Sequence, residues 1–444
     1  MRIVQAVGWY LPDSLGGTEL YVAALAARLR ELGHEVVIAA PDAAHLGERQ
    51  YRHDGFDVYR YAIPAEATRA EARGTALVRG AERFHAWLAA TRPDVVHFHT
   101  FVTGLGVREV EAARAVARRV LATTHASSLG FVCERGTLLR FGRALCDGVA
   151  EPVKCGACAL EHRGIPRLAA EGLARVPAAV SRRAAALPGR AATAVGMRAL
   201  IEGNRELQRR LFAALDAFVV LTAWARGVLI ANGAPAAKVI VNRLGVLHRP
   251  GGWPRPERAP GAGRDRPVEV GLVARAEAIK GIEDAVRAVA SLPLDTRLRL
   301  TVVAAARGPT ERRLVEGCRA LAAGDDRISF HDAVTPSAMP AVLGGFDLLL
   351  CPSRAVEGGP TVALEAHAVG TPVVASDLPA MNEFIEPGVN GDLHPPGEVP
   401  ALARVLARVA ADPSALDRWR AALAPPRTSH DVADDYLAIY APPT

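Results

Sequence analysis

Two glutamates frame a glycine-rich break in the segment EGGPTVALE, with Glu357 at its start and Glu365 at its end. The apolar runs DLLLCPS and GTPVVAS flank it and predict two buried strands. A helix starting near Thr361 would offer unpaired N–H groups and a positive dipole end to a phosphate. Gly358 and Gly359 would let a ligand approach the backbone closely. Glu365, about one turn into the helix, could accept hydrogen bonds from a sugar diol.

Two other interpretations of this glutamate pair must be weighed. Paired carboxylates act as acid and base in glycosidases. They can also be a chance pair of surface charges. The flanking strands and the glycines favour a third role, in which Glu357 and Glu365 hold a ligand around a phosphate site.

A basic loop follows another predicted strand in the segment VARAEAIKG. Arg275 lies in this loop, and Lys280 stands at the start of the next helix. Two cations at the carboxyl end of a strand can neutralise a pyrophosphate. The alternative is an ordinary exposed basic loop.

Three histidines end or follow predicted strands in the first half of the chain. His97 and His99 alternate at the end of DVVHFHT, and we expect both to be packed in the core. His125 follows the strand RVLATT, where α/β sheets bind ligands, and we expect it in the site.

Four of the six cysteines fall within one loop, and the last two have the spacing Cys-x2-Cys. The candidate metal ligands are Cys133, Cys146, Cys155 and Cys158. Clustered thiols in a cytoplasmic protein predict a structural zinc site. An iron–sulfur cluster uses the same ligands, and reduced thiols without metal are a third alternative. Cys318 and Cys351 are expected in the core.

Composition limits the function classes. The formal charge of +6 over 444 residues is mildly basic, and no interleaved basic and aromatic pattern indicates nucleic-acid binding. The start MRIVQAVGWYLP predicts a strand rather than a signal peptide, and no run of about 18 uncharged apolar residues predicts a spanning helix. We therefore expect a cytoplasmic protein without disulfides.

Short apolar strands alternate with helices along the chain and must position these residues. In the first half the predicted strands are 2–7, 35–40, 94–100, 119–125, 217–222 and 238–242. Gly16 and Gly17 lie in the loop between the first strand and its helix. The alternation begins again after residue 267. This predicts two doubly wound α/β domains with parallel sheets, and a ligand site in the cleft between them.

The expected domain organisation follows from the same alternation. The first domain spans 1–245, with a cysteine loop at 126–160 and a helical, Arg-rich insertion at 160–215. A Pro-, Gly- and Arg-rich linker at 246–267 precedes the second domain at 268–427 and a last helix at 428–444. The insertion is interpreted as a solvated helical face, with a basic face for anionic lipid as the alternative.

Taken in order, these motifs resemble the retaining glycosyltransferases of family 4, which have the GT-B fold of two Rossmann-like domains. The resemblance covers almost the whole chain. It rests on GGTELYVAALAARLRELGHEV, DVVHFHT, TTHA, the basic loop, the E-x7-E element and GTPVVASD. The final SHDVADDYLAIY resembles the helix that crosses back onto the first domain in this family.

The resemblance implies a role for each position. Glu365 would hold the ribose hydroxyls and Glu357 would contact the donor sugar. Arg275 and Lys280 would bind the diphosphate, and His125 would lie beside the transferred sugar. The implied catalytic set is His125, Glu357, Arg275 and Lys280. The implied donor-binding set is Gly16, Gly17, Arg275, Lys280, Glu357, Gly358, Gly359, Pro360, Thr361, Val362 and Glu365.

One departure from the family pattern affects the sugar pocket. The family commonly has Gly-Phe-Gly after the first glutamate, and this chain has Gly358, Gly359 and Pro360. The resemblance still implies a backbone role for the glycines, but it does not imply the family's usual shape for the sugar pocket.

The expected function is transfer of a sugar from a UDP- or GDP-sugar to a hydroxyl acceptor, with retention and without a catalytic metal. The acceptor is a glycan, a lipid-linked sugar or a natural product, and contact with the inner membrane face is an expectation. The alternatives are a nucleotide-sugar epimerase of GT-B-like fold and a non-catalytic sugar-nucleotide binder.

Overall fold

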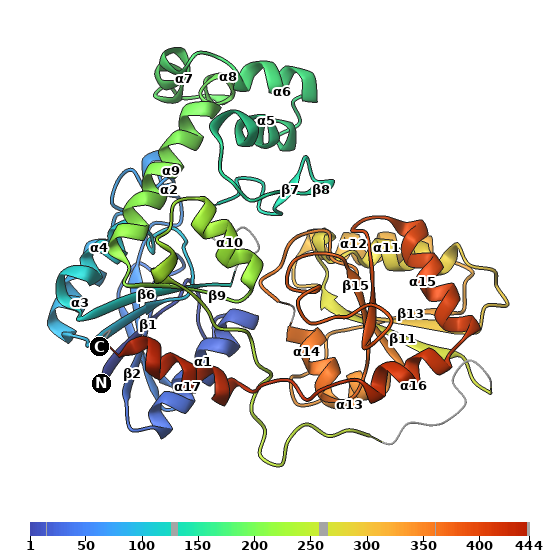
Figure 1. The fold of residues 1–444 in the computed structure, drawn as a ribbon. Helices are drawn as coiled ribbons and strands as arrows, with labels where there is room; N and C mark the ends of the chain where they lie inside the picture. Colours follow the sequence, from blue (N-terminus) through green and yellow to red (C-terminus); the bar gives the residue numbers. More distant parts are fainter. Residues whose placement is uncertain (15, 126–131, 257–264, 360, 442–444) are drawn as a thin grey trace. The chain divides into compact units, whose positions relative to one another are not determined.

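The computed structural model describes residues 1–14, 16–125, 132–256, 265–359 and 361–441 (Figure 1). These residues form two compact units. Unit 1 is Met1–Leu247 together with the segment that begins at Ser429, and unit 2 is His248–Thr428. Pro360 and parts of the expected cysteine loop, linker and C-terminal segment lie outside the described residues.

Unit 1 is built on an eight-stranded sheet of order β10-β9-β6-β5-β1-β2-β4-β3. All its pairs are parallel except β3 with β4. Its strands are β1 (Arg2–Ala6), β2 (Glu35–Asp42), β3 (Arg49–His53), β4 (Phe56–Ala62), β5 (Val95–Phe98), β6 (Arg119–Thr124), β9 (Ala217–Val220) and β10 (Val239–Val241).

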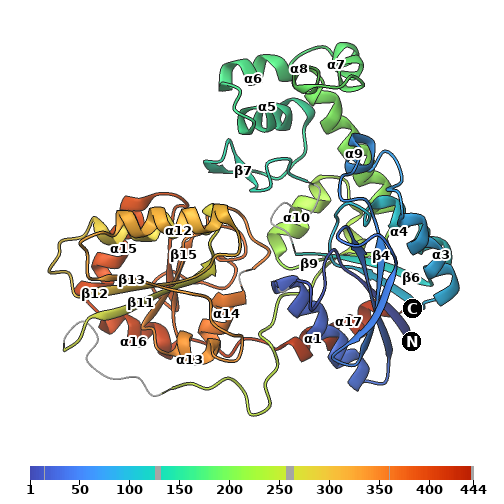
Figure 2. The same cartoon turned by 180° about the vertical axis from the view of Figure 1, so that it is seen from behind.

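Helices pack on both faces of this sheet (Figures 1 and 2). Side chains of β4 alternate between the faces, because Phe56 and Val58 join the core under α1 (Gly17–Glu31) while Tyr59 and Tyr61 meet the aromatic side chains of α3 (Ala81–Thr91). The other helices of unit 1 are α2 (Arg69–Ala72), α4 (Val107–Val116), α5 (Pro152–His162), α6 (Arg167–Ala174), α7 (Ala178–Ala185), α8 (Arg190–Val195), α9 (Met197–Ala214), α10 (Ala223–Ala231), the 3-10 helix η1 (Ala236–Lys238) and α17 (Ser429–Tyr440).

The last helix, α17, completes the core of unit 1 although it follows unit 2 in the sequence. Val432, Ala433, Tyr436 and Tyr440 are buried among side chains of α1 and the sheet. On the solvent side, Arg28 of α1 pairs with an α17 carboxylate. The helix is therefore part of the unit's interior rather than a surface addition.

Helices α5 to α9 carry the Arg-rich sequence, and α6, α7 and α8 lie at the end of unit 1 farthest from its sheet (Figure 1). Several of the arginines pair with glutamates, as Arg167 does with Glu171, Arg198 with Glu202 and Arg210 with Glu111. In the described part of the chain, no helix has the length and apolar character needed to span a bilayer.

Unit 2 contains a fully parallel six-stranded sheet of order β13-β12-β11-β14-β15-β16. The strands are β11 (Val268–Arg275), β12 (Leu298–Ala305), β13 (Ile328–His331), β14 (Leu348–Cys351), β15 (Val373–Ser376) and β16 (Gly391–His394). The helices are η2 (Ala278–Lys280), α11 (Ile282–Ala290), α12 (Pro309–Leu321), α13 (Met339–Gly344), α14 (Thr361–Ala368), α15 (Val399–Ala411) and α16 (Ser414–Ala421).

The strand β14 shows why this sheet needs helices on both faces. Leu348 and Leu350 point into the core made with α11, α12, α15 and α16, whereas Leu349 and Cys351 point into the core made with α13 and α14. A strand that is apolar at every position is stable only when both its faces are covered. The predicted fold class, two parallel α/β sheets with helices on both faces, is confirmed.

Three pieces of β-structure were not expected from the sequence. The pair β3–β4 begins with RQYRH, whose charges suit an edge strand that is partly exposed. The short hairpin β7 (Leu139–Arg140) and β8 (Ala144–Leu145) lies in the cysteine loop, and β16 closes the sheet of unit 2. All three lack a long apolar run, which was the signal used to predict strands.

Candidate functional site

Charged side chains gather at the carboxyl ends of β11 and β14, which are neighbours in the sheet of unit 2. The loop after β14 carries Ser353, Arg354 and Glu357, while Arg275 ends β11 and Lys280 ends η2. Because parallel strands end at the same edge, the two connections meet there. Doubly wound sheets bind ligands at this edge.

The two connections touch at Gly281. This glycine has φ +69°, and a Cβ on it would lie 1.9 Å from the carbonyl oxygen of Pro352. Nearby, the backbone N–H of Arg354 donates to the carbonyl of Ile279 at 2.7 Å. The Arg354 Nε also donates to Oδ2 of the buried Asp284 in α11 at 2.5 Å. The start of α11 is thus fixed against the loop after β14.

This arrangement brings Lys280 and Glu357 together. Lys280 Nζ donates to Glu357 Oε2 at 2.5 Å, and the Ser353 hydroxyl donates to the other carboxylate oxygen. Both charged side chains keep 18% of their surface exposed. Burial raises the pKa of the adjacent Cys351 thiol to about 12, and the charge of Glu357 adds to this effect. The Lys280 ammonium has three N–H donors and uses one of them for Glu357. The others can still bind an anion, while the Glu357 carboxylate accepts hydrogen bonds from hydroxyl groups.

Arg275 takes a different partner at the same edge. Its Nη1 lies 2.7 Å from Oε1 of Glu277, and its side chain is 56% exposed. Exposed ion pairs of this kind contribute little to stability, typically about 0–1 kcal/mol. A diphosphate, which offers charge-assisted hydrogen bonds, can therefore replace Glu277 as the partner of Arg275.

The glycine segment leads into the N-terminus of α14. Gly359 has φ +129°, a conformation that residues with a Cβ rarely adopt. Thr361 and Val362 form the first turn of α14, whose backbone N–H groups have no partner within the helix. Gly358 precedes them, and Pro360 lies outside the described residues. The backbone here can approach an anion closely.

Glu365 lies in the second turn of α14. Burial raises the pKa of its carboxyl group, and the nearby positive charge of Arg249 opposes that shift. Arg249 itself stacks over the ring of Trp253, with its guanidinium carbon 4.6 Å from the ring centroid. No sequence motif pointed to Arg249, because it stands in the Pro- and Gly-rich stretch that was interpreted as a linker.

In unit 1, Gly16 and Gly17 begin α1. Gly16 is the N-cap residue, and a Cβ on it would lie 2.7 Å from an oxygen of Glu19. A Cβ on Gly17 would meet no described atom within 4 Å. Glu19 is buried and accepts the Ser14 hydroxyl at 2.6 Å. Gly17 is therefore the more open of the two glycines.

His125 follows β6 at one end of a hydrogen-bonded network in unit 1. Its Nε2 lies 3.2 Å from Nδ1 of His99, and Nε2 of His99 lies 2.6 Å from Oε1 of Gln5. Because an amide oxygen can only accept, His99 carries its proton on Nε2 and accepts at Nδ1. His125 must then donate through Nε2, which leaves the lone pair on its Nδ1. The ring of Tyr21 packs edge-on against the ring of His125, with the two ring centroids 4.6 Å apart.

All three histidines are neutral at pH 7. Burial lowers the pKa of His125 to about 4, and it lowers the pKa of His97 and His99 well below the usual value. His125 keeps part of its surface exposed, whereas His97 and His99 are buried. His97 and His99 are thus core residues, as expected, and His99 additionally contacts His125. His125 can act as a neutral hydrogen-bonding group.

The network continues from the strands into α17. His97 lies 2.8 Å from the Tyr440 hydroxyl and 2.7 Å from that of Thr123, and Thr123 lies 2.6 Å from the Tyr436 hydroxyl. Gln5 Nε2 donates to Tyr440 at 3.2 Å. Each polar side chain in this buried group therefore has a partner, as a low-dielectric interior requires.

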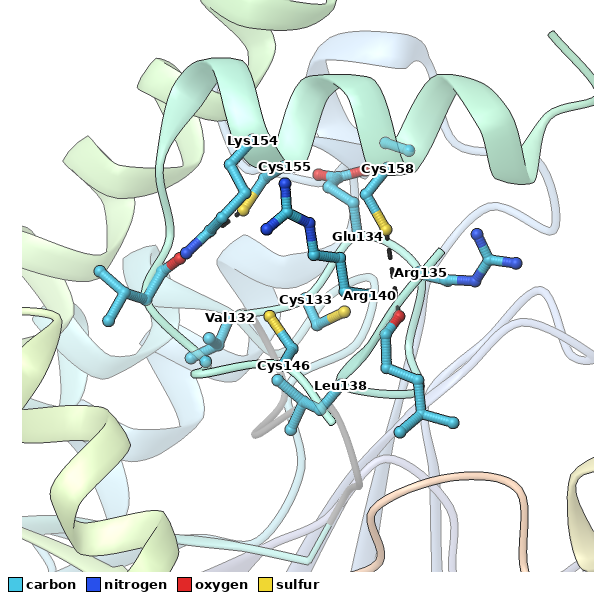
Figure 3. A pocket seen from close by; sticks show the side chains of 14 residues that line it. Val132, Cys133, Glu134, Arg135, Leu138, Arg140, Cys146, Lys154, Cys155 and Cys158 are labelled. Atoms are coloured by element: carbon cyan, nitrogen blue, oxygen red, sulfur yellow. Dashed lines mark hydrogen bonds between the residues drawn. The ribbon is translucent and has the colours of Figure 1, made fainter. Parts of the chain in front are cut away.

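The four clustered cysteines line a single pocket in unit 1 (Figure 3). Cys133 and Cys146 come from the loop before α5, and Cys155 and Cys158 come from α5 itself. All four are free thiols. Within the described residues, no three His, Cys, Asp or Glu side chains are already arranged to hold a metal ion.

A second cavity of unit 1 opens beyond the carboxyl end of β5. It is lined by the loop that follows this strand, by the start of α4, by α2 and the segment after it, and by α9. Phe101 and Leu211 give its wall an apolar part, and Arg73 and Arg108 give it a cationic part. Burial lowers the pKa of Arg73. No sequence motif pointed to this cavity, because its residues come from three separated segments.

Two family models match the chain. The model for glycosyl transferases group 1 matches residues 256–423, and the model for the glycosyl transferase 4-like domain matches residues 16–154. The first match includes the Lys280–Glu357 pair and Glu365, and the second includes Gly17 and His125.

Curated relatives match part of the chain. The amylovoran biosynthesis glycosyltransferase AmsK of Erwinia amylovora is 30% identical over 226 residues, which are 48% of this chain and 52% of the relative. The alpha-D-kanosaminyltransferase of Streptomyces kanamyceticus is 32% identical over 179 residues, covering 39% and 45% of the two chains. The matched region thus spans about half the length of these relatives.

Solved structures match the whole chain in fold. Sucrose-phosphate synthase from Thermosynechococcus elongatus superposes with a TM-score of 0.63 at 18% identity, covering 99% of this chain and 98% of that one. Anabaena HepE in complex with UDP-glucose gives a TM-score of 0.61 at 14% identity, covering 99% of each chain. The two family models and the curated relatives make the chain a member of the family 4 type of glycosyltransferases. The solved structures show that it has the GT-B fold.

Proposed function

We propose that this protein transfers a sugar from a nucleoside-diphosphate sugar to a hydroxyl acceptor, with retention of configuration and without a catalytic metal. The observation that carries the proposal is the Lys280–Glu357 pair at the carboxyl edge of unit 2, next to the N-terminus of α14. A cation, a carboxylate and a helix N-terminus together suit a sugar joined to a diphosphate.

The proposed donor contacts divide by chemistry. Glu365 accepts hydrogen bonds from the two ribose hydroxyls, and its carboxylate must be ionised to accept both. Lys280 and Arg275 neutralise the diphosphate, which the N–H groups at the start of α14 also bind. Glu357 contacts the sugar hydroxyls. The structure of HepE holds UDP-glucose, and we extend a uridine or guanosine diphosphate sugar to this chain as part of the proposal.

The mechanism follows from the charge that develops in the reaction. Cleavage of the sugar–phosphate bond builds negative charge on the diphosphate and positive character on the sugar ring. Lys280, Arg275 and the α14 N–H groups are fixed before reaction and stabilise the leaving diphosphate. The acceptor hydroxyl attacks from the side of the leaving group and passes its proton to the departing phosphate oxygen. No side chain acts as nucleophile.

His125 would support the transferred sugar as a neutral group. Its Nε2–H is committed to His99, so its Nδ1 lone pair would accept a hydrogen bond from a sugar hydroxyl. A neutral ring suits this task, because a positive imidazolium would have no lone pair to offer.

We assign the acceptor to the cavity lined by Phe101, Arg73 and Arg108. An aromatic wall packs against the face of a sugar ring, and the arginines would bind an anionic substituent on it. Glycan, lipid-linked sugar and natural-product acceptors all satisfy this chemistry. AmsK is named for amylovoran biosynthesis, and the Streptomyces relative is named for kanosaminyl transfer.

We further propose peripheral contact with anionic lipid through α6 to α8. Residues 166–190 contain five arginines and one glutamate. Leu168, Val180 and Leu187 expose 85%, 48% and 57% of their surface in the same segment. Basic and apolar side chains together favour an anionic bilayer surface. Sedimentation with anionic vesicles should deplete the protein from solution, and neutral vesicles should not; equal behaviour with both would refute the contact.

The test of the central proposal is incubation with a panel of nucleotide sugars, with and without pooled hydroxyl acceptors. A transferase releases nucleotide only when an acceptor is present. A nucleotide-sugar epimerase would convert the donor without any acceptor, and a non-catalytic binder would bind the donor without releasing nucleotide. Either of these results would replace the proposed activity.

A further inference from the structure

The four thiols of the cysteine pocket face one another across it. Figure 3 shows the sulfurs of Cys155 and Cys158 pointing from α5 toward the loop, and those of Cys133 and Cys146 pointing from the loop toward α5. The spacing along the chain is Cys-x12-Cys-x8-Cys-x2-Cys. Two ligands on a loop and two on one helical turn form a set that can close around a single ion.

A backbone N–H group already points at one of the sulfurs. The N–H of Phe141 donates to Cys158 Sγ at 3.3 Å. Donors of this kind stabilise sulfur in its thiolate form and orient metal ligands.

A tight turn presents the first cysteine to the pocket. The N–H of Gly136 donates to the carbonyl of Cys133 at 3.0 Å, and Gly136 has φ +78°. Gly148, two residues after Cys146, has φ +73°. Glycines in the left-handed region therefore follow both loop cysteines, where the chain must turn back sharply.

The charge of the pocket suits a thiolate–metal centre. Four thiolates and one divalent cation carry two net negative charges. Arg135, Arg140 and Lys154 line the same pocket. Lys154 Nζ lies 2.7 Å from Asp147, and Arg135 Nη1 lies 2.5 Å from Glu161, so these cations are held in place by neighbouring carboxylates.

The loop also has little regular structure of its own to hold it in place. Over residues 132–150 its regular structure is the two-residue hairpin β7–β8, and the associated hydrophobic cluster is small, with Phe141, Ala157 and Ala174 as its buried members. Loops of this length with so little regular structure are uncommon in compact domains unless something fixes them.

We propose that Cys133, Cys146, Cys155 and Cys158 bind one zinc ion as a tetrahedral structural site that fastens the loop at 132–150 to α5. Binding converts four thiols into thiolates and releases four protons to solvent. The thiols line the wall of the pocket without being at ligating positions in this structure, so binding requires them to move toward one ion. Zinc suits a purely structural role, because it has no redox chemistry.

The experiment uses the full chain purified without metal-affinity resin. Metal analysis should find one zinc per chain, and removal by a chelator under reducing conditions should lower the melting temperature, which added zinc should restore. Cobalt exchanged into the wild-type protein should give the intense sulfur-to-metal absorption of tetrahedral thiolate ligation. This measurement needs no variant to fold.

Matched variants localise the site. Cys155→Ser and Cys158→Ser should lose most of the zinc, whereas Cys318→Ala, which alters a buried thiol of unit 2, should keep it. Protein that contains no metal and does not respond to zinc or cobalt would overturn the proposal. Iron with acid-labile sulfide would overturn it in favour of an iron–sulfur cluster.

The proposal can fail separately from the transferase function. Metal content and cobalt absorption are measured without substrate, and donor binding is measured by titration with a nucleotide sugar. A zinc-free protein that still transfers sugar would refute the zinc site alone, and a zinc protein without donor binding would refute the transferase proposal alone.

Discussion

The carbonyl oxygen of Pro352 lies 1.9 Å from the position that a Cβ on Gly281 would occupy. Only glycine fits this point, where the start of α11 meets the loop after β14. The contact holds Lys280, the residue before Gly281, beside Glu357 on the other loop. The close contact between these two backbone segments therefore brings together the charged residues of the proposed donor site.

Gly281→Ala should destabilise the protein and weaken donor binding together. The new methyl group would clash with backbone and force a positive φ on alanine, at a combined cost of about 3 kcal/mol or more. Gly324→Ala is the matched control, since Gly324 has φ +84° in unit 2 with no described atom within 4 Å of its Cβ position. Gly324→Ala should lower the free energy of unfolding by about 1–2 kcal/mol and leave donor binding intact. Denaturant unfolding and donor titration measure both effects, and equal losses in the two variants would contradict the role of the contact.

Lys280→Ala should reduce kcat on the order of 10²-fold, because it removes a fixed positive charge from the leaving diphosphate. Arg287→Ala, in the helix α11 that follows Lys280, provides the control, because Arg287 pairs with Glu283 at 2.7 Å on the exposed side. Its steady-state rate should stay close to that of the wild type. If the two variants were equally active, Lys280 would have no part in the chemical step.

Glu365 should make donor affinity depend on pH. Burial raises the pKa of its carboxyl group in the free protein, and binding of a ribose diol favours the ionised form. Affinity should therefore fall as the pH drops through this raised pKa and become constant above it. Calorimetric titration with the free nucleoside diphosphate at several pH values measures this dependence.

Two substitutions separate charge from hydrogen bonding at this position. Glu365→Ala should weaken nucleotide binding by about ten- to a hundredfold, and Glu365→Gln should abolish the pH dependence that Glu365 causes. A pH dependence that persists unchanged in Glu365→Gln would assign it to another group.

His125 should not titrate near neutral pH. Burial places its pKa at about 4, so its protonation should not change between pH 6 and pH 8. Nitrogen-15 spectra of the imidazole should show a proton on Nε2 and a lone pair on Nδ1. A pKa near the ordinary value, or a proton on Nδ1, would contradict the order of donors inferred through His99 and Gln5.

His99 is expected to act as a positioning residue for His125. His99→Leu removes the acceptor for the Nε2–H of His125 and should lower kcat/KM about tenfold. His99→Gln keeps an oxygen acceptor and should recover much of that loss. If both variants lost activity equally while the nitrogen-15 spectrum of His125 stayed unchanged, His99 would have a packing role alone.

Much of the fold could be predicted because its signal is local. Apolar strands such as 348–351 alternate with amphipathic helices, and burial on both faces requires that pattern. The edge strand β3 was not predicted, because a half-exposed strand can contain many charged residues and then lacks an apolar run. The glycine segment and its two glutamates were recognisable for the same reason, because they are contiguous in sequence.

The remaining features of the site depend on contacts between distant segments. The bond between Lys280 and Glu357 joins residues 77 positions apart, and that between His97 and Tyr440 joins residues 343 positions apart. The local sequence around each of these residues does not indicate which residue will be its partner. The acidic partner of Arg275 was unexpected too, because sequence alone does not show which charge a side chain will turn toward.

The position of α17 has a consequence for how the protein is made. Tyr436 and Tyr440 fill the interior of unit 1, yet the ribosome synthesises them only after the whole of unit 2. A nascent chain ending near residue 247 would hold an incomplete core, with His97, Thr123 and Gln5 lacking their tyrosine partners. Unit 2, which is contiguous in the sequence, can therefore fold first during translation. Unit 1 is synthesised first, but its folding is completed last.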